Sequence, residues 1–480
     1  MSTPAPLDRR TLLGGSAGAL GLLVAGSSAP FAAHATAAQT TRLAAGYGPL
    51  RPAGELLALP EGFSYTVLAE SGTTTVGGYA VAGSQDAMGA FARAGGGSTI
   101  VCNHEIGGAD DGAVPHVDGL VYDRGAKGGT STLVVDADNT VLEHYTSVAG
   151  TVDNCAGGIT PWGTWLTCEE TDERAGTHED DGVTYTFEQD HGYVFEVDPT
   201  SQAANIGKAN IPLKFLGRFE HEAAVVEEAT GRIYLTEDAD EPNGLFYRWT
   251  PPVGYRQGKG ALHVLAADGA VEVGTLEALV AFERNGAHVT DLSKATKTNT
   301  TYTVRWVEVP DRDARATPIR EQLADDEVTR ARKLEGQWWG DGGVYVVSSY
   351  ARSDDGSLHE HDGQVWFFDP RKQTITLTTI FAVNEDGAGV DGPDNITVSP
   401  HGGLVLAEDG EGASQLIGVT DQGKAYRLAL NLVDDSEWAG PTFDAAGTTL
   451  FANIQGDPGR TFAITGPWGR PSNARESARG

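Results

Sequence analysis

Cys155, Glu222, Glu335 and the pair formed by Asp394 and Asn395 occupy equivalent places in four segments that share one local pattern. In each segment a turn follows the polar residue, and a β-rich run with an acidic or polar end follows the turn. If these segments are equivalent inner strands of a closed β-structure, their side chains converge on one axis. Converging carboxylates repel one another and take up protons unless cations bind between them. The pattern therefore predicts a metal site.

The ligand types in this set indicate two kinds of metal. Carboxylate and carbonyl oxygens suit calcium, whereas a thiolate suits a softer transition metal such as iron or zinc. Other roles stay open for each residue. Glu222 or Glu335 could be a channel carboxylate that contacts only water. Asp394 with Asn395 could form an Asx turn, and Cys155 could pack as a small hydrophobic residue.

Acidic residues at the ends of the β-rich runs form a second set of candidate ligands. Side chains alternate between the two faces of a strand, so we expect only one member of each adjacent pair to face the axis. His104 and His221 are interpreted as hydrogen-bonding neighbours rather than ligands. The candidates retained from this set are Glu105, Glu169, Glu170 and Glu408.

These residues lie in a repeat of two kinds of strand. Runs of the first kind cover 99–105, 164–170, 233–238, 344–349, 404–409 and 450–455. A run of the second kind follows each of them, at 132–136, 192–199, 244–249, 363–370, 425–428 and 461–464. Glycine-rich turns separate the runs, which is an all-β signature. Six alternating pairs predict a six-bladed β-propeller. A β-sandwich is the structural alternative.

The interval between the third and fourth runs of the first kind is too long for one blade, because a blade needs about 40–50 residues plus loops. Within it, residues 275–282 and 318–334 have helical periodicity. We therefore expect a partly helical insertion over about 253–334 that caps one end of the propeller. Residues 36–480, with this insertion, are expected to form a single β-propeller domain.

Residues 1–35 have the features of a secretory signal peptide. Arg9 and Arg10 precede a weakly apolar stretch, and residues 33–35 form a small-x-small cleavage site. The adjacent arginines favour the twin-arginine route, although the pair could also stand by chance before an ordinary signal. The stretch is too short and too rich in glycine to span a membrane. We expect export to the periplasm, the cell wall or the medium, and no membrane span.

The composition is strongly acidic, with 34 basic and 66 acidic residues and a formal net charge of -32 at pH 7. Nucleic-acid binding demands basic patches, so we expect no nucleic-acid partner. The 3 cysteines are too few for a disulfide framework. Cys102 could pair with Cys168, which leaves Cys155 over. The protein is expected to be a monomer.

Several motifs together resemble the PhoX-type alkaline phosphatase family. The most specific motif runs from Asn154 through Cys155 to Glu170, and others cover residues 191–199, 217–222 and 440–455. The resemblance extends from about residue 99 to Trp468. It implies a six-bladed propeller with an iron–calcium cluster that hydrolyses phosphomonoesters.

The resemblance also implies ligands. In the family a cysteine and glutamates bind iron, while carboxylates and carbonyls hold calcium. Carried over by motif, the best matches are Cys155, Glu222 and Glu335, and the next are Glu169 or Glu170 and Glu105. Which ligand binds iron and which binds calcium stays open. Residues 331–334 lack the proline expected in the family, and the chain is short for it. These departures concern the substrate-facing loops more than the metal core.

The charge of the substrate defines a mechanistic hypothesis. Small phosphoesters bring negative oxygens into the site, and cations neutralise the charge that develops during in-line displacement. A metal-bound oxo or hydroxide is the expected nucleophile, because no side-chain nucleophile stands out in an expected motif. The residues that could contact phosphate, or could instead be surface charges, are Arg332, Lys333, Arg248 and Arg352.

Three other functions stay open. A calcium-dependent propeller lactonase or sugar-acid esterase would use similar channel carboxylates, but it has no need for the thiol of Cys155. A non-catalytic calcium-binding propeller would show calcium-dependent stability without turnover. A family member specialised for diesters or nucleotides would differ only in its variable loops.

Overall fold

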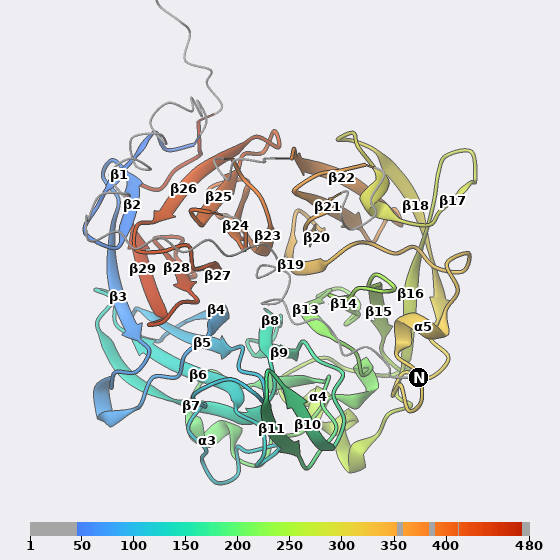
Figure 1. The fold of residues 1–480 in the computed structure, drawn as a ribbon, viewed down its shortest axis with the longest axis horizontal. Coiled ribbons are helices and arrows are strands. Elements are labelled where there is room, and N and C mark those ends of the chain that lie inside the picture. Colours follow the sequence, from blue (N-terminus) through green and yellow to red (C-terminus); the bar gives the residue numbers. More distant parts are fainter. Residues whose placement is uncertain (1–45, 353–358, 384–388, 411, 473–480) are drawn as a thin grey trace, which may run out of the picture. The chain divides into compact units, whose positions relative to one another are not determined.

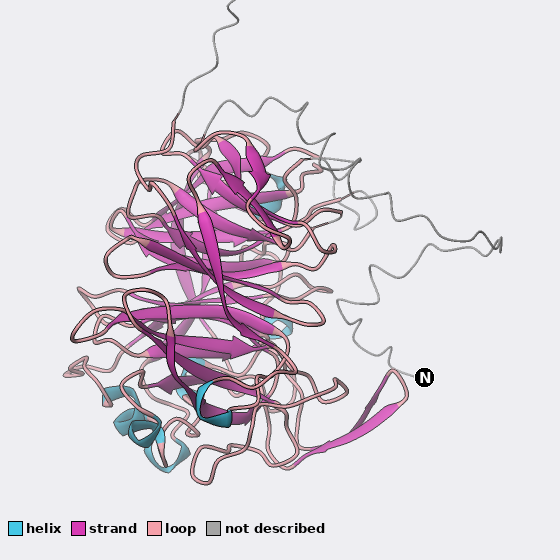
Figure 2. Ribbon diagram, turned by 90° about the vertical axis from the view of Figure 1, so that its left-hand side faces the viewer, coloured by secondary structure: helices cyan, strands magenta, loops and turns pink. Residues whose placement is uncertain are grey.

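A computed structural model describes residues 46–352, 359–383, 389–410 and 412–472. These residues belong to one compact unit, Leu43–Gly480, and they form mostly β-strands with a few short helices (Figure 2). The predicted all-β class is confirmed. The predicted signal peptide, residues 1–35, lies outside the described residues. Within the described ranges, no helix is both long and apolar enough to cross a membrane.

Antiparallel sheets follow one another around a central axis in chain order, as the blades of a propeller do (Figure 1). The innermost strands are β4 (Gln85–Ala92), β8 (Asn154–Ile159), β13 (His221–Val226), β19 (Leu334–Gly340), β23 (Pro393–Val398) and β27 (Trp438–Phe443). The strands beside them are β5 (Ser98–His104), β9 (Trp165–Glu169), β14 (Ile233–Glu237), β20 (Gly343–Ser348), β24 (Leu404–Glu408) and β28 (Thr449–Ile454).

The outer positions complete the sheets. They are occupied by β6 (Gly128–Val135), β7 (Val141–Thr151), β12 (Val194–Val197), β15 (Phe246–Thr250), β16 (Thr275–Phe282), β21 (Gly363–Asp369), β22 (Thr374–Phe381), β25 (Gln415–Val419), β26 (Ala425–Asn431) and β29 (Arg460–Thr465). Every run predicted to be a strand overlaps one of these strands, so the strand repeat is confirmed. The sequence analysis missed β7, β22 and β25 of these outer strands and predicted a helix at β16.

The first and last strands of the described unit meet in shared sheets. β3 (Ser64–Glu70) pairs with β29 and completes the sheet that β27 begins. β2 (Leu57–Pro60) pairs with β26, and β1 (Leu50–Pro52) pairs with β2. The blue and red strands therefore lie side by side in Figure 1. These pairings close the ring of sheets, because the last sheet takes its outer strand from the start of the chain.

A wide sheet occupies much of the predicted helical insertion. β16 pairs with β15 on one side and with β18 (Thr301–Glu308) on the other, and β18 reaches β22 of the next sheet. β17 (His288–Val289) also pairs with β16. The prediction that residues 275–282 are helical is therefore wrong. Leu276 and Ala278 pack in one core cluster while Leu279 and Ala281 pack in another. A strand buried on both faces is continuously apolar, and its periodicity resembles that of a buried helix.

Helices in this part of the chain are short. α4 (Ala261–Leu265) and α5 (Ile319–Gln322) are the α-helices between residues 253 and 334. Of the helix predicted over 318–334, only α5 forms, and turns follow it until β19 begins. Elsewhere, α3 (Gln202–Asn205) follows β12, and a hairpin of β10 (Gly176–Asp180) and β11 (Val183–Phe187) lies between β9 and β12 in sequence.

Two glycines allow the inner strands to approach closely. A Cβ on Gly158 of β8 would lie 1.7 Å from the carbonyl oxygen of Ala224 in β13. A Cβ on Gly157 would lie 1.9 Å from the carbonyl oxygen of Leu166 in β9. No larger residue fits at either place without backbone movement. The glycine pair that follows Cys155 therefore sets how closely β8 packs against its neighbours.

Candidate metal centre

A β-bulge interrupts the start of each inner strand. The register shifts lie between Gln85 and Met88, Asn154 and Gly157, His221 and Ala224, Leu334 and Gln337, Pro393 and Ile396, and Ala439 and Thr442. A bulge adds a residue to one strand and re-aims its side chain. The first bulged residues are Asp86, Cys155, Glu222, Glu335, Asp394 and Gly440. The strands thus present potential ligands at five of these equivalent places.

A left-handed residue precedes four of these bulges by two positions. The residues and their φ angles are Ser84 (47°), Asp153 (44°), Lys333 (41°) and Gly392 (48°). Their carbonyl oxygens accept hydrogen bonds of 2.8–2.9 Å from the backbone N–H groups of Glu105, Glu170, Ser349 and Asp409. Left-handed backbone is strained for residues other than glycine, so its recurrence indicates a fixed local geometry. The same turn therefore leads into the bulge in four sheets.

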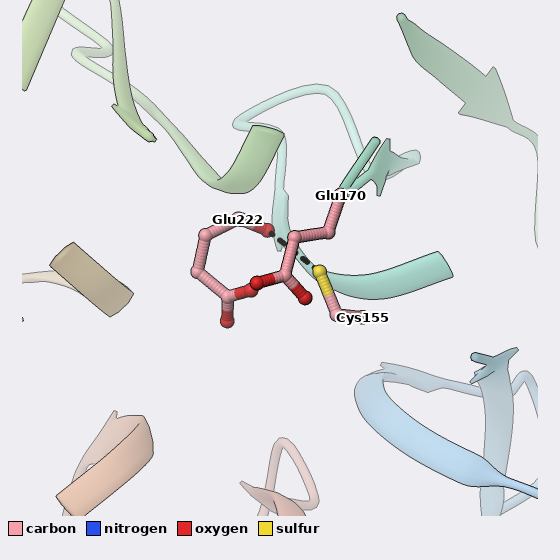
Figure 3. Close-up of side chains that lie close together, drawn as sticks. All are labelled: Cys155, Glu170 and Glu222. Carbon is pink, nitrogen blue, oxygen red and sulfur yellow. Dashed lines mark hydrogen bonds between the residues drawn. The ribbon is translucent and has the colours of Figure 1, made fainter. Parts of the chain in front are cut away.

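The bulged residues converge in two groups of potential ligand atoms. The Cys155 thiol and carboxylate oxygens of Glu170 and Glu222 lie within 4.8 Å of one another (Figure 3). Carboxylate oxygens of Glu222, Glu335 and Asp394 lie equally close. Glu222 belongs to both groups. All of these side chains are buried except that of Glu170, which is partly exposed.

The backbone at Cys155 is held by a buried amide from the neighbouring sheet. Asn103 Nδ2 donates to the carbonyl oxygens of Cys155 (2.9 Å) and Ala156 (2.8 Å). Asn103 Oδ1 accepts hydrogen bonds from Trp165 and Thr167 at 2.9 Å each. Asn103 therefore uses both its amide nitrogen and its amide oxygen. The nitrogen supplies hydrogen bonds to the carbonyl groups of Cys155 and Ala156, which have no partner in the β-ladder because of the bulge.

The charges around Cys155 make a cation favourable. Burial raises the pKa of the Cys155 thiol well above its usual range, and Glu222, Glu170, Asp86 and Glu105 raise it further. Without a cation the thiol therefore keeps its proton. A thiolate forms at this place only when a positive charge offsets burial and the nearby carboxylates. The donor set of a thiol and several carboxylates fits a metal centre.

Asn395 lies beside the second group. Its Nδ2 donates to Asp394 Oδ1 (3.1 Å) and to Glu222 Oε1 (3.5 Å), and its Oδ1 accepts from the backbone N–H of Gly440 (2.6 Å). Asn395, which was predicted to be a ligand, therefore lies at the site, where its amide contacts the carboxylates of Asp394 and Glu222. Its amide links β23 with β27.

Glu169 points away from both groups. One oxygen accepts from His191 Nδ1 (2.7 Å) and from the backbone N–H of Val152 (3.0 Å). The other accepts from the backbone N–H groups of Gly192 and Tyr193. Burial alone would lower the pKa of His191, but Glu169 and Asp123 outweigh burial and raise it to about 9. Glu169 therefore lies outside both groups, whereas its neighbour Glu170 belongs to the first.

Glu105 and Glu408 have different places. Glu105 Oε2 accepts from Gln455 Nε2 at 2.7 Å, and its charge contributes to the raised pKa of the Cys155 thiol. Glu408 lies outside both groups, and its Oε1 accepts from the backbone N–H of Asp391 (2.9 Å) and from Gln415 Nε2 (3.2 Å).

Two acidic neighbours were missed by the sequence analysis. Asp86 is buried at the bulge of β4, and its charge also raises the pKa of the Cys155 thiol. The pKa of Glu437 is raised well above its usual range by burial and then by Asp409, Glu105 and Asp394. Asp86 stands 13 residues before residue 99, whereas Cys155 stands 9 before residue 164, so the spacing of the other segments did not single it out.

The alkaline phosphatase PhoX family model matches residues 45–144 and 137–459. The chain belongs to this family. Membership makes it a phosphomonoesterase. Among solved structures, Pseudomonas fluorescens PhoX in complex with vanadate, a transition state analogue, is similar, with a TM-score of 0.65 and 18% identity over 88% of this chain and 98% of that chain.

The pyranose dehydrogenase PQQ domain from Coprinopsis cinerea has a TM-score of 0.39 and 8% identity, over 86% of this chain and 98% of that chain. No curated protein matches the chain.

The four candidate phosphate contacts of this PhoX-family enzyme differ in position. Lys333 Nζ lies 2.9 Å from Asp238 Oδ2 and 3.5 Å from Glu335 Oε1, so it contacts the second group directly. Arg332 leads into the same bulge, and its backbone N–H donates to Ser293 Oγ.

Each of the other two candidates pairs with a carboxylate that belongs to neither group. Arg352 Nε lies 2.5 Å from Asp362 Oδ1. Arg248 pairs with Glu277 between the outer strands β15 and β16 and lies over the ring of Trp306. The structure therefore gives Arg248 a role in the outer sheet.

The cysteines of this PhoX-family chain form no disulfide. Cys102, Cys155 and Cys168 are all free and buried. The pairing considered between Cys102 and Cys168 is therefore absent, and Cys155 is not a residue left over from a disulfide.

Proposed function

We propose that this chain is an exported phosphomonoester hydrolase that holds iron and calcium in the channel of a six-bladed propeller. The single observation that carries the proposal is the buried thiol of Cys155 beside the carboxylates of Glu170 and Glu222. A thiol in a carboxylate cluster has little purpose in a calcium lactonase or a calcium-binding module. It suits a centre that combines a softer metal with calcium.

The contacts between inner strands support six blades. Contacts join β4 to β8, β8 to β13, β13 to β19, β19 to β23, β23 to β27 and β27 back to β4. Each of these strands begins an antiparallel sheet, and two sheets merge at their outer edge through β18. We interpret the wide sheet as two blades joined by the insertion at 253–334. Residues 36–480 then form one domain.

The two groups of ligand atoms suggest a division between the metals. The group with Cys155, Glu170 and Glu222 contains the soft donor and would hold iron. The group with Glu222, Glu335 and Asp394 contains only oxygen donors and would hold calcium. These residues would hold the metals, which would supply positive charge to the phosphoryl oxygens and would lower the pKa of an attacking water.

The residues of the chain do the remaining work. The bulges hold the ligands before metal and substrate arrive, which limits reorganisation during the reaction. Lys333 places a positive charge beside Glu335, where it can contact a phosphate oxygen. The chain carries a net charge of -32, so attraction of an anionic ester depends on local positive charge. Small phosphomonoesters are the substrates that this arrangement favours.

The proposal is tested by removing and restoring the metals. Chelated protein is reloaded with iron and calcium, and hydrolysis of p-nitrophenyl phosphate is measured for wild type, Cys155→Ala and Cys102→Ala. Cys102 is the matched control because it is also buried but lies outside both groups. We expect activity to return in wild type and in the control but not in Cys155→Ala. Equal recovery in all three would refute the centre, and hydrolysis of lactones without phosphate esters would favour the lactonase.

Export is tested separately. The proposal of the twin-arginine route rests on Arg9 and Arg10. Replacement of both by lysine should retain the folded protein inside the cell, whereas unchanged export would show that another route is used.

A further inference from the structure

A side chain at the end of the second strand contacts the backbone just before the bulge in four sheets. The contacts are His104 Nδ1 with Gly83 O (2.8 Å), Glu169 Oε1 with Val152 N (3.0 Å), Ser348 Oγ with Arg332 O (2.6 Å), and Glu408 Oε1 with Asp391 N (2.9 Å). In each case the contacted residue stands three positions before the bulged residue, which is Asp86, Cys155, Glu335 or Asp394.

The four side chains also hold the same place in the register. His104 is the partner of Gln85, Glu169 of Asn154, Ser348 of Leu334, and Glu408 of Pro393. Each is therefore the last paired residue before the bulge. Its side chain reaches over the left-handed residue to the backbone that enters the turn. The ladder is interrupted at the bulge, so this bond fixes a segment that the sheet alone does not hold.

We propose that these residues are positioning residues for the metal centre, and that Glu169 positions the Cys155 and Glu170 ligands together. Its bond to Val152 fixes the segment that enters the Cys155 bulge. It is also the residue directly before Glu170, whose backbone N–H donates to Asp153 of that same segment. A single carboxylate thus links the two ligand-bearing segments of the first group.

The hydrogen bonds of Glu169 exclude it as a ligand. Four donors surround its two oxygens: the backbone N–H groups of Val152, Gly192 and Tyr193, and the ring N–H of His191. These donors use the lone-pair directions that a cation would need. The other ring nitrogen of His191 lies 3.3 Å from Asp123, which extends the network away from the channel. Replacement of a residue that orients metal ligands in this way typically lowers the metal affinity by about 10–100-fold.

The test compares Glu169→Gln with Glu196→Gln. Glu196 is a matched control, because it is a buried carboxylate in the same sheet, but it accepts from the side chains of Trp162 and Thr164. Co²⁺ is the probe, and its thiolate-to-metal absorption band reports the geometry at Cys155, with Cys155→Ala as the blank. We expect Glu169→Gln to bind Co²⁺ at least about 10-fold more weakly and to shift the band. Glu196→Gln should retain the wild-type affinity and band, even if its melting temperature falls equally.

Two outcomes would overturn the role of Glu169. One is an affinity and a band that match those of Glu196→Gln. The other is the loss of one metal equivalent with an unchanged band, which would make Glu169 a ligand. The inference rests on the proposed metal centre, so absence of Co²⁺ binding by wild type would remove both.

If Glu169→Gln does not fold, Ser348→Ala carries the test, since it deletes only one hydroxyl group. It should weaken Ca²⁺ binding several-fold in a calorimetric titration and leave the Co²⁺ band at Cys155 unchanged. Wild-type Ca²⁺ affinity in Ser348→Ala would overturn the positioning role.

Discussion

The thiol of Cys155 and a carboxylate oxygen of Glu222 lie within 4.8 Å of each other, although 67 residues separate them in the chain. Adjacent inner strands bring them together, and a bulge in each strand aims both side chains at the channel. Glu222 also belongs to the group that contains Glu335 and Asp394. Glu222 is therefore shared between the proposed iron site and the proposed calcium site.

Replacement of Glu222 should affect both metals, whereas replacement of Asp394 should affect one. We expect Glu222→Gln to lose iron and most of its calcium, because the residue belongs to both groups. Asp394→Asn should retain iron and lose calcium. Elemental mass spectrometry of the purified variants measures both, with Glu277→Gln on the outer strand β16 as the control. Normal iron content in Glu222→Gln would contradict the shared position.

Removal of the metals should make stability more sensitive to pH. Burial raises the pKa values of Glu408 and Glu437 well above the usual range. Their native carboxyl groups therefore keep protons that the unfolded chain releases, so stability falls as pH rises above the ordinary carboxyl pKa. We expect the chelated protein to melt on the order of 5 °C lower at about pH 9 than at about pH 6.

The loaded protein is the control for this prediction. The loaded protein loses the same His191 contribution over this range. Bound cations offset the charge of the carboxylates in the loaded protein only, so its melting temperature should fall less than that of the chelated protein. Parallel curves for chelated and loaded protein would show that cations do not relieve repulsion in the channel.

His191 should stabilise the fold in a defined pH window. Its folded pKa of about 9 lies above the usual value near about 6.5. Its contribution is therefore fully present below about pH 6.5 and is lost as the pH rises through about 9. The shift corresponds to about 3 kcal/mol. We expect His191→Gln to lower the free energy of unfolding strongly at about pH 6 and only weakly at about pH 10, as measured by denaturant titration. An equal loss at both values would indicate a packing effect alone.

Lys333 should contribute to substrate binding without holding metal. We expect Lys333→Met to lower kcat/KM by about 10–100-fold, the effect of losing a charge-assisted bond of about 1.5–3 kcal/mol. Metal content should stay at the wild-type level. Arg248→Met is the control, because Arg248 pairs with Glu277 between outer strands. Similar losses in both variants would argue against a phosphate contact at Lys333.

The strand repeat and much of the site could be predicted from the sequence. Cys155, Glu222, Glu335 and Asp394 stand at the start of segments whose turns and strand ends recur visibly. Asp86 was missed because the bulge is a property of the backbone, and no residue type marks it. Its equivalent positions hold Asp, Cys, Glu and even Gly, as at Gly440.

The choice within acidic pairs could not be predicted. Glu169 and Glu170 are adjacent, and alternation indicates that only one of them faces the channel. The register of β9 decides which one, and it depends on pairing with β8 and β12. The same limit on prediction applies to residues 275–282. Because β16 is buried on both faces, its sequence lacks the alternation of apolar and polar residues that distinguishes a strand from a helix.

The central claim is that this PhoX-family chain works through metals held at Cys155 and its neighbouring carboxylates. The most direct test measures iron and calcium in the purified, exported protein by elemental mass spectrometry, with hydrolysis of p-nitrophenyl phosphate followed in the same fractions. The account predicts that both metals co-purify with activity. Full activity in fractions that contain neither iron nor calcium would contradict it.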